Sequence, residues 1–288
     1  MSADRRADLS GLCGGISPAL VSRRTGLRLA ASALATGAAA FSAFPSFAQT
    51  ALSGDLLVAA AADLKFALDE VIGGFGKTHP QVTVKASYGS SGNLFAQIAQ
   101  GAPFDLFLSA DAGFPRRLVT TGKADEASRF IYGIGRLVVW VPKASGIEVE
   151  KAGIRALLDP RAAKIAIANP AHAPYGAAAV AAMEHYGIHA AVKDRLVLGE
   201  NVAQAAQFVG SGAADIGVIA RSLAVAPKMA DTGRLWEIPA EAHPRLEQGG
   251  VVLTGGKNAE AARALRAVLT GEEGRAVLAR YGFVLPDK

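Results

Sequence analysis

Four short segments of the sequence place hydrogen-bond donors where helices are expected to begin. Each stands between a predicted strand and a predicted helix; the segments are Ala61-Ala62-Asp63, Ser90-Ser91-Gly92-Asn93, Pro174-Tyr175-Gly176 and Glu200-Asn201-Val202. In an α/β sheet, turns of this kind lie at the carboxyl ends of the strands, where ligands bind. The first N–H groups of a helix lack an intrahelical acceptor, and the helix dipole places about half a positive charge there. Several such helix starts around one cleft would bind an anion without lysine or arginine.

Serine hydroxyl groups would add further donors to such a cleft. A fully deprotonated oxyanion only accepts hydrogen bonds, so a cleft lined by donors matches its chemistry. Ordinary helix capping by Asp63, Ser91 and Asn201 accounts for the same residues one by one. The pattern therefore predicts either an anion-binding cleft or three unrelated helix caps.

The sequence motifs of enzymes are poorly matched. Gly133-Ile134-Gly135 resembles the start of a dinucleotide-binding fingerprint, but the sixth position is Val138 and a strand follows. Residues 89–92 do not form a G-x-S-x-G nucleophile elbow, and the sequence contains no Walker A motif. With 5 His, 1 Cys and 7% aromatic residues, the composition argues against haem, iron–sulfur and cysteine-ligated zinc proteins. We therefore predict a protein that is not an enzyme and that has no cofactor.

Three histidines are the remaining candidates for metal ligands. His185 and His189 are four residues apart, but Gly187 lies between them at the predicted end of a helix. A solvent-exposed helix end is the better interpretation of this pair. His172 lies in a loop bounded by prolines, where we expect a loop contact rather than ligand binding. No side chain is therefore predicted to ligate a metal.

The charge of the chain is unevenly distributed. Residues 1–48 hold five arginines and two aspartates, a net charge of +3, which leaves 25 basic and 23 acidic residues, a net +2, for the other 240. No basic cluster follows Arg28, so a nucleic-acid partner is not expected.

The first 48 residues have the features of an export signal. The pair Arg23-Arg24 precedes an apolar run over residues 29–44 and a small-x-small site at Ser46-Phe47-Ala48. The arginine pair matches most of the twin-arginine pattern. An ordinary secretory signal or an anchor helix is the alternative, although the apolar run is short for a membrane span. We expect cleavage near the end of residues 1–48 and a periplasmic protein, which loses Cys13 with its signal.

The elements that must position the four segments are predicted from apolar periodicity. Short apolar runs alternate with segments in which apolar residues recur every three or four positions. The predicted strands are 56–60, 82–86, 105–108, 137–141, 164–168, 196–198, 216–220 and 251–254, and the predicted helices are 64–76, 93–100, 176–185, 201–209 and 259–281. This alternation is typical of α/β proteins with a mainly parallel sheet. The length favours two α/β lobes with a ligand cleft between them.

Four motifs stand out by their order and spacing: V-A-A-A-A-D-L at residues 58–64, Y-G-S-S-G at 88–92, G-A-P-F-D-L-F-L-S-A-D at 101–111 and R-Y-G-F at 280–283. In this order and spacing they resemble a known family, the periplasmic molybdate-binding proteins of ABC importers. The resemblance covers about residues 55–285. It implies a type II periplasmic binding-protein fold with lobe I at 50–132 plus 241–288, lobe II at 133–240, a double-strand hinge and closure over a tetrahedral oxyanion.

The resemblance also assigns roles to individual residues. It implies that Asp63 stands where the family has its first ligand-binding serine, and that Ser91 is its second serine. The implied backbone donors are the N–H groups of Tyr175 and Val202. Ala220 stands where the family often has a tyrosine hydroxyl.

Further cleft residues are implied beside these positions: Ala62, Ser90 and Arg221. An ionised Asp63 would repel a dianion, because a carboxylate only accepts hydrogen bonds. Asp63 therefore either turns away and caps its own helix, or stays protonated and donates, or accepts a hydrogen bond from a protonated oxyanion. We favour the first of these, since aspartate is a good helix cap.

The resemblance implies a solute-binding protein that captures molybdate or tungstate and delivers it to an ABC permease as a monomer. The alternative is the same scaffold binding another oxyanion, such as phosphate, arsenate or sulfate, because Asp63 replaces the usual serine. An exported enzyme is a third, less favoured hypothesis.

Overall fold

The computed structural model describes residues 52–286. The predicted export signal at 1–48, with its arginine pair and Cys13, lies outside the described residues. The described residues belong to one compact unit. In the part that is described, no helix is both long enough and apolar enough to cross a membrane.

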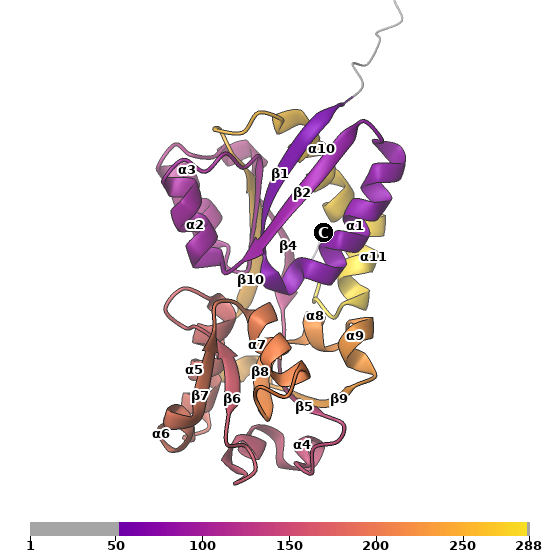
Figure 1. The fold of residues 1–288 in the computed structure, drawn as a ribbon. Helices are drawn as coiled ribbons and strands as arrows, with labels where there is room; N and C mark the ends of the chain where they lie inside the picture. Colours follow the sequence, from indigo (N-terminus) through magenta and orange to yellow (C-terminus); the bar gives the residue numbers. More distant parts are fainter. Residues whose placement is uncertain (1–51, 287–288) are drawn as a thin grey trace, which may run out of the picture. The chain divides into compact units, whose positions relative to one another are not determined.

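Two five-stranded sheets form the framework (Figure 1). In spatial order, the first sheet contains β2 (Val82–Gly89), β1 (Gly54–Ala61), β3 (Leu106–Ser109), β10 (Leu246–Val252) and β4 (Phe130–Gly135). The second contains β7 (Leu196–Gly199), β6 (Ile165–Ala168), β8 (Ile216–Ala220), β5 (Leu137–Pro142) and β9 (Gly233–Glu237).

Each sheet is mixed rather than mainly parallel. Strands β2, β1 and β3 are parallel, whereas β10 runs antiparallel to both of its neighbours. In the second sheet β7, β6 and β8 are parallel, and β5 is antiparallel to β8 and β9. The two reversed strands belong to the connections between the sheets: β4 continues into β5 after Arg136 alone, and residues 238–245 lead from β9 to β10. Strands that enter from a neighbouring sheet are not subject to the parallel direction that a helical crossover imposes.

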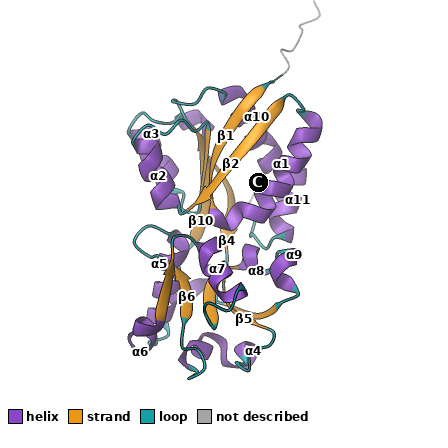
Figure 2. Cartoon of the chain, in the orientation of Figure 1, coloured by secondary structure: helices purple, strands orange, loops and turns teal. Residues whose placement is uncertain are grey.

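Helices cover both faces of the first sheet (Figure 2). One face carries α1 (Lys65–Thr78), α10 (Ala259–Thr270) and α11 (Glu272–Arg280), and the other carries α2 (Ser91–Ala99) and α3 (Gly113–Thr120). Because side chains alternate along a strand, Val58 packs with the α1 side and its neighbour Ala59 with the α2 side. The elements around the second sheet are α4 (Val149–Ala152), α5 (Pro174–His185), α6 (His189–Val192), α7 (Val202–Gly210), α8 (Arg221–Ala224) and α9 (Pro227–Ala230).

The core of the second sheet extends to the ends of the first-sheet strands. A single cluster of buried residues contains Trp140 and Met183 together with Ala61, Ala62 and Ala110. The latter three come from the ends of β1 and β3 and their turns. The ends of the β1 and β3 strands therefore pack against the core of the second sheet, at the predicted turns.

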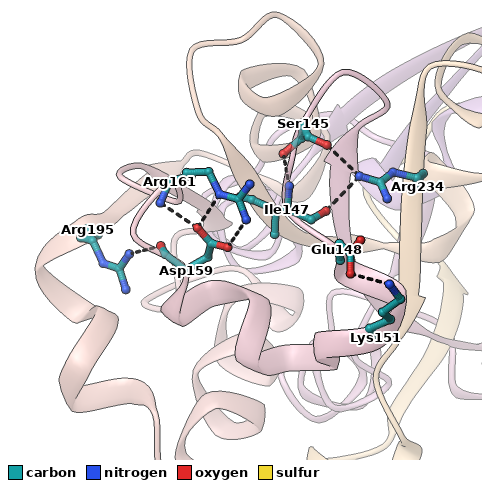
Figure 3. A network of polar contacts seen from close by, with 8 residues as sticks. All are labelled: Ser145, Ile147, Glu148, Lys151, Asp159, Arg161, Arg195 and Arg234. Atoms are coloured by element: carbon teal, nitrogen blue, oxygen red, sulfur yellow. Dashed lines mark hydrogen bonds and ion pairs between the residues drawn. The ribbon is translucent and has the colours of Figure 1, made fainter.

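Arginine side chains stabilise the segments of the second sheet that have little regular structure (Figure 3). Arg195 donates hydrogen bonds to the backbone carbonyls of Leu157 at 2.8 Å, Asp159 at 3.2 Å and Ala162 at 2.6 Å. Arg234 donates to the carbonyls of residues 145 and 147 at 2.8 and 2.9 Å. These bonds satisfy backbone carbonyls of the connecting segments, of which those of Asp159 and Ile147 also accept a neighbouring backbone N–H.

Several predicted boundaries are wrong in ways that follow from local composition. The prediction omitted β4, which contains two glycines, and β9, which contains glycine and two charged residues. It began β10 five residues late because residues 247–250 are Glu, Gln, Gly and Gly. The last predicted helix is two helices, because Gly271 is extended (φ −74°, ψ 179°). Helices α2 and α5 begin two residues before the predicted starts, which places Ser91 and Tyr175 in their first turns.

Candidate anion-binding site

The four predicted turn segments meet at one small cavity, here called the central cavity. Its volume is about 10 Å³, room for about one water molecule. The lining residues come from both sheets and are Ala61, Ala62, Asp63, Gly89, Ser90, Ser91, Ala110, Ala173, Pro174, Tyr175, Asn201 and Val202. They include no lysine or arginine. The structure thus brings together Asp63, Ser91, Tyr175 and Val202, and with them Ala62 and Ser90.

Ser91 has a hydroxyl proton available for a ligand. The cap of α2 is Ser90, which accepts a hydrogen bond from the N–H of Asn93 at 3.4 Å, rather than Ser91. Ser91 is 1% exposed, and its Oγ accepts the N–H of Ala110 at 2.9 Å. A hydroxyl that accepts in this way keeps its own proton for donation. The cap interpretation therefore fails for Ser91.

The backbone donors of the second sheet lie at the starts of α5 and α7. Tyr175 is in the first turn of α5 and Val202 is the first residue of α7, so their N–H groups have no intrahelical acceptor. Asn201 caps α7 as predicted, accepting from two backbone N–H groups at 3.0 Å. A Cβ on Gly176 would overlap with the carbonyl oxygen of Ala168. Glycine there lets α5 begin directly against the end of β6.

A loop of the second sheet contacts the start of α2 beside the central cavity. Ser90 Oγ lies 2.8 Å from Nδ1 of His172, and the N–H of Gly92 donates to the His172 carbonyl at 3.0 Å. A Cβ on Gly92 would stand 2.6 Å from that carbonyl oxygen, so the approach requires glycine. His172 therefore makes a loop contact, as predicted, and this contact joins the two sheets.

Asp63 is buried and its two carboxylate oxygens differ. It is 1% exposed, and Oδ2 accepts hydrogen bonds from Tyr175 Oη at 3.0 Å and from Gln248 Nε2 at 2.6 Å. Gln248 Oε1 in turn accepts from Tyr132 Oη at 2.9 Å. Oδ1 is buried and has no hydrogen-bond partner among the described residues. The favoured prediction that Asp63 caps its own helix is wrong, since no side chain caps the 3-10 turn Ala62–Leu64 in the described structure.

Burial dominates the protonation chemistry of this site. It raises the pKa of Asp63 from 3.8 to about 6, although the hydrogen bonds from Gln248 and Tyr175 and the nearby backbone N–H groups of Asp63 and Leu64 lower it. Burial also raises the pKa of Tyr175 and of Tyr132 well above the usual value, and the nearby Asp63 charge adds to the rise. Both tyrosines are therefore neutral hydrogen-bonding groups at physiological pH.

Comparisons with known proteins place this arrangement in a family. The family described as "Bacterial extracellular solute-binding protein" matches residues 56–284. The chain belongs to this family. This solute-binding protein is similar in sequence to the molybdate-binding protein ModA of Rhodobacter capsulatus, with 34% identity over 251 residues (87% of this chain and 96% of the relative). It is 36% identical over 238 residues to ModA of Azotobacter vinelandii, covering 82% of this chain and 92% of the relative.

A solved structure supports the fold of this solute-binding protein. The periplasmic molybdate-binding protein of Azotobacter vinelandii superposes with a TM-score of 0.75 and 32% identity, over 81% of this chain and 100% of that chain. The sulfate-binding protein SubI of Mycobacterium tuberculosis, 19% identical with a TM-score of 0.65, shares the fold. The two-lobe α/β fold of periplasmic binding proteins, expected from the resemblance, is confirmed.

Arg221 does not lie where it was expected in this solute-binding protein. Neither it nor Ala220 lines the central cavity among the described residues. Ala220 is fully buried in β8, and the Arg221 guanidinium forms an ion pair with Glu237 at 3.0 Å. Arg136 pairs with the same carboxylate, which draws both arginines to the junction of the sheets. The neighbouring Ser222 is the residue that reaches the site, donating from Oγ to the Asp63 carbonyl at 2.8 Å.

Three residues of the site were missed because they belong to the omitted or misplaced strands. Tyr132 and Gly135 lie on β4, and Gln248 lies on β10 next to an irregularity in the strand pairing. A Cβ on Gly135 would overlap with the Tyr175 hydroxyl and lie 2.7 Å from Gln248 Nε2. A lone glutamine inside the run L-E-Q-G-G-V-V was the signal that could have revealed a buried polar contact.

Histidines do not form a metal site in the described part of this solute-binding protein. No group of three or more His, Cys, Asp or Glu side chains is placed to hold a metal ion there. His189 Nδ1 lies 3.7 Å from Glu184 at a half-exposed helix end, in keeping with the interpretation of the His185 and His189 pair.

Proposed function

We propose that this solute-binding protein captures molybdate or tungstate in the central cavity and delivers it to the membrane permease of an ABC importer. The observation that carries the proposal is a cavity lined by helix starts and serine with no lysine or arginine. Such a site offers donors to an acceptor-only dianion. The relatives named as molybdate-binding proteins support the same ligand.

The ligand is proposed to contact both lobes, 50–132 plus 241–288 and 133–240. Lobe I would contribute Asp63 and the Ser91 hydroxyl, and lobe II would contribute the N–H groups of Tyr175 and Val202, with Ala62 and Ser90 completing the wall. A cavity of about 10 Å³ cannot admit a tetrahedral oxyanion without movement. The lobes would therefore part to admit the ligand and close over it, stabilised by contacts to both sides.

The location and partners follow from this role. The protein would be exported to the periplasm through a twin-arginine signal in residues 1–48 and would act there as a monomer. It would bind its ligand without turnover, have the permease as its protein partner and need no cofactor. A second candidate, another oxyanion such as hydrogen phosphate or arsenate, is favoured by one observation: the buried Oδ1 of Asp63 has no partner among the described residues.

A thermal-shift scan of the purified protein against molybdate, tungstate, sulfate, phosphate and arsenate tests the proposal. A ligand at about 1,000 times its dissociation constant adds about 4 kcal/mol to the free energy of unfolding. For a chain of this size, that raises the melting temperature by about 8–16 °C. A shift with molybdate and tungstate alone supports the proposal. A shift only with phosphate or arsenate favours the second candidate, and no shift with any of them refutes both.

A further inference from the structure

The carboxyl group of Asp63 has one satisfied oxygen and one unsatisfied oxygen. Oδ2 accepts from Tyr175 on α5 and from Gln248 on β10, and Gln248 Nε2 also donates to the Tyr175 hydroxyl at 3.0 Å. Oδ1 is buried without a partner among the described residues, and Asp63 is one of the residues that line the central cavity. The unsatisfied atom therefore belongs to a residue of the wall that would face a bound anion.

An ionised Asp63 is incompatible with a fully deprotonated dianion in this wall. Both groups would only accept hydrogen bonds, and two negative charges in contact repel each other most strongly where water is excluded. A proton on Oδ1 removes both conflicts, because Oδ1 then donates to an anion oxygen. Oδ2 can still accept from Tyr175 and Gln248, since a carboxylic acid retains its carbonyl oxygen as an acceptor.

We propose that a fully deprotonated dianion binds here together with one proton from solvent, which Asp63 Oδ1 carries and donates in a hydrogen bond to the anion. This inference rests on the proposed function. The step balances: the ionised Asp63 carboxylate, one proton from solvent and one dianion combine into one complex, in which Asp63 is a neutral carboxylic acid and the anion keeps its two negative charges. Affinity for molybdate therefore falls about tenfold for each pH unit above the pKa of Asp63 in the free protein.

The groups packed around Asp63 do not supply a compensating cation. Tyr175 and Tyr132 are neutral, Gln248 and Ser222 carry no charge, and all four contact either Asp63 or its partners. The raised pKa of Asp63 agrees with this environment, because burial is its largest cause.

Three basic side chains close in sequence to Asp63 or to its hydrogen-bonding partners are paired with carboxylates. Lys65, two residues along the chain, pairs with Asp69 at 3.2 Å and is half-exposed. Arg221 and Arg136 pair with Glu237.

One histidine near the cavity requires a control. His172 contacts Ser90 and lies 4.0 Å from Glu200. His172→Gln keeps a hydrogen-bonding partner for Ser90 and removes the imidazole. Asp63→Asn replaces the proposed O–H donor with a permanent N–H donor of the same shape.

The experiment is isothermal titration calorimetry of the purified protein with molybdate at pH 7, 8 and 9. Pairs of buffers with different ionisation enthalpies give the number of protons bound with each anion. We expect about one proton per molybdate and about a hundredfold weaker binding at pH 9 than at pH 7. Asp63→Asn should bind molybdate with no proton uptake and little pH dependence, and His172→Gln should behave as the unmodified protein does.

The outcomes separate this inference from the proposed function. Tight molybdate binding with no proton uptake and no pH dependence overturns the inference alone. Unchanged proton uptake in Asp63→Asn also overturns it, because another group would then carry the proton. Binding of phosphate alone without proton uptake, or no binding of any oxyanion at any pH, overturns the proposed function and the inference with it. If Asp63→Asn fails to fold, the proton count of the unmodified protein still decides the question.

Discussion

The buried carboxyl group of Asp63 should make the stability of the ligand-free protein depend on pH. Burial raises its pKa from 3.8 to about 6, so the folded state disfavours the ionised form that the unfolded chain accepts. The stability that the neutral carboxyl group confers is fully present below pH 3.8 and is lost as the pH rises to about 6. A pKa difference of about 2 units corresponds to about 3 kcal/mol in the free energy of unfolding.

Asp63→Asn should remove this loss of stability at higher pH while keeping the shape of the side chain. The amide oxygen can accept the hydrogen bonds from Tyr175 and Gln248 that Oδ2 now accepts, but the amide does not ionise. Between pH 4 and pH 7.5 we expect the unmodified protein to lose about 2–3 kcal/mol relative to the variant. The melting temperatures of the two should then diverge by about 5–10 °C.

Urea unfolding followed by far-UV circular dichroism, at several pH values and without ligand, measures this difference. The matched control is Asp231→Asn, the same substitution at an exposed position. Only the difference between pH values is used, because it cancels any change in packing caused by the amide. If the free energies of unfolding of Asp63→Asn and of the unmodified protein change with pH in parallel, the argument that burial raises the pKa of this carboxyl group is refuted.

Three further predictions concern other parts of the structure. Gly135→Ala, whose Cβ would overlap the hydrogen-bond network under Asp63, should lower the melting temperature by several degrees and weaken molybdate binding. In contrast, the Cβ of Gly133→Ala would have its nearest contact at 3.4 Å. This variant should therefore keep the melting temperature and the molybdate affinity of the unmodified protein. Ser91→Ala should weaken molybdate binding about ten- to a hundredfold in calorimetry, because a hydrogen bond to a charged group is lost; unchanged affinity would remove Ser91 from the site. Arg195→Ala should reduce the free energy of unfolding by about 2–4 kcal/mol, since it leaves the Leu157 and Ala162 carbonyls without their donor and removes one of two donors to the Asp159 carbonyl, while molybdate affinity measured by calorimetry stays the same.

Much of the fold was predictable because the necessary information is local. The helix start at Ser91 follows a strand of alternating pattern, the helix start at Val202 follows a short apolar strand, and both carry a polar cap. Local composition therefore indicates a strand, a turn and a helix at each place. The strands that were omitted, or begun five residues late, are β4, β9 and β10, which lie at the connections between the sheets. Their glycines and polar residues, such as Gly135 and Gln248, have partners far away in the chain and therefore disrupt the local apolar pattern.

Some features of the candidate site follow from the sequence, and others only from the tertiary structure. The sequence by itself determined which residues end the strands and begin the helices, and therefore which donors an anion could meet. Only the tertiary structure decided what Asp63 does. Its partners Tyr175 and Gln248 lie 112 and 185 positions away, and they hold Oδ2 while Oδ1 is left unsatisfied. Helix capping is a contact within one turn, whereas the environment of a buried carboxyl group is set by whatever the folded chain packs against it.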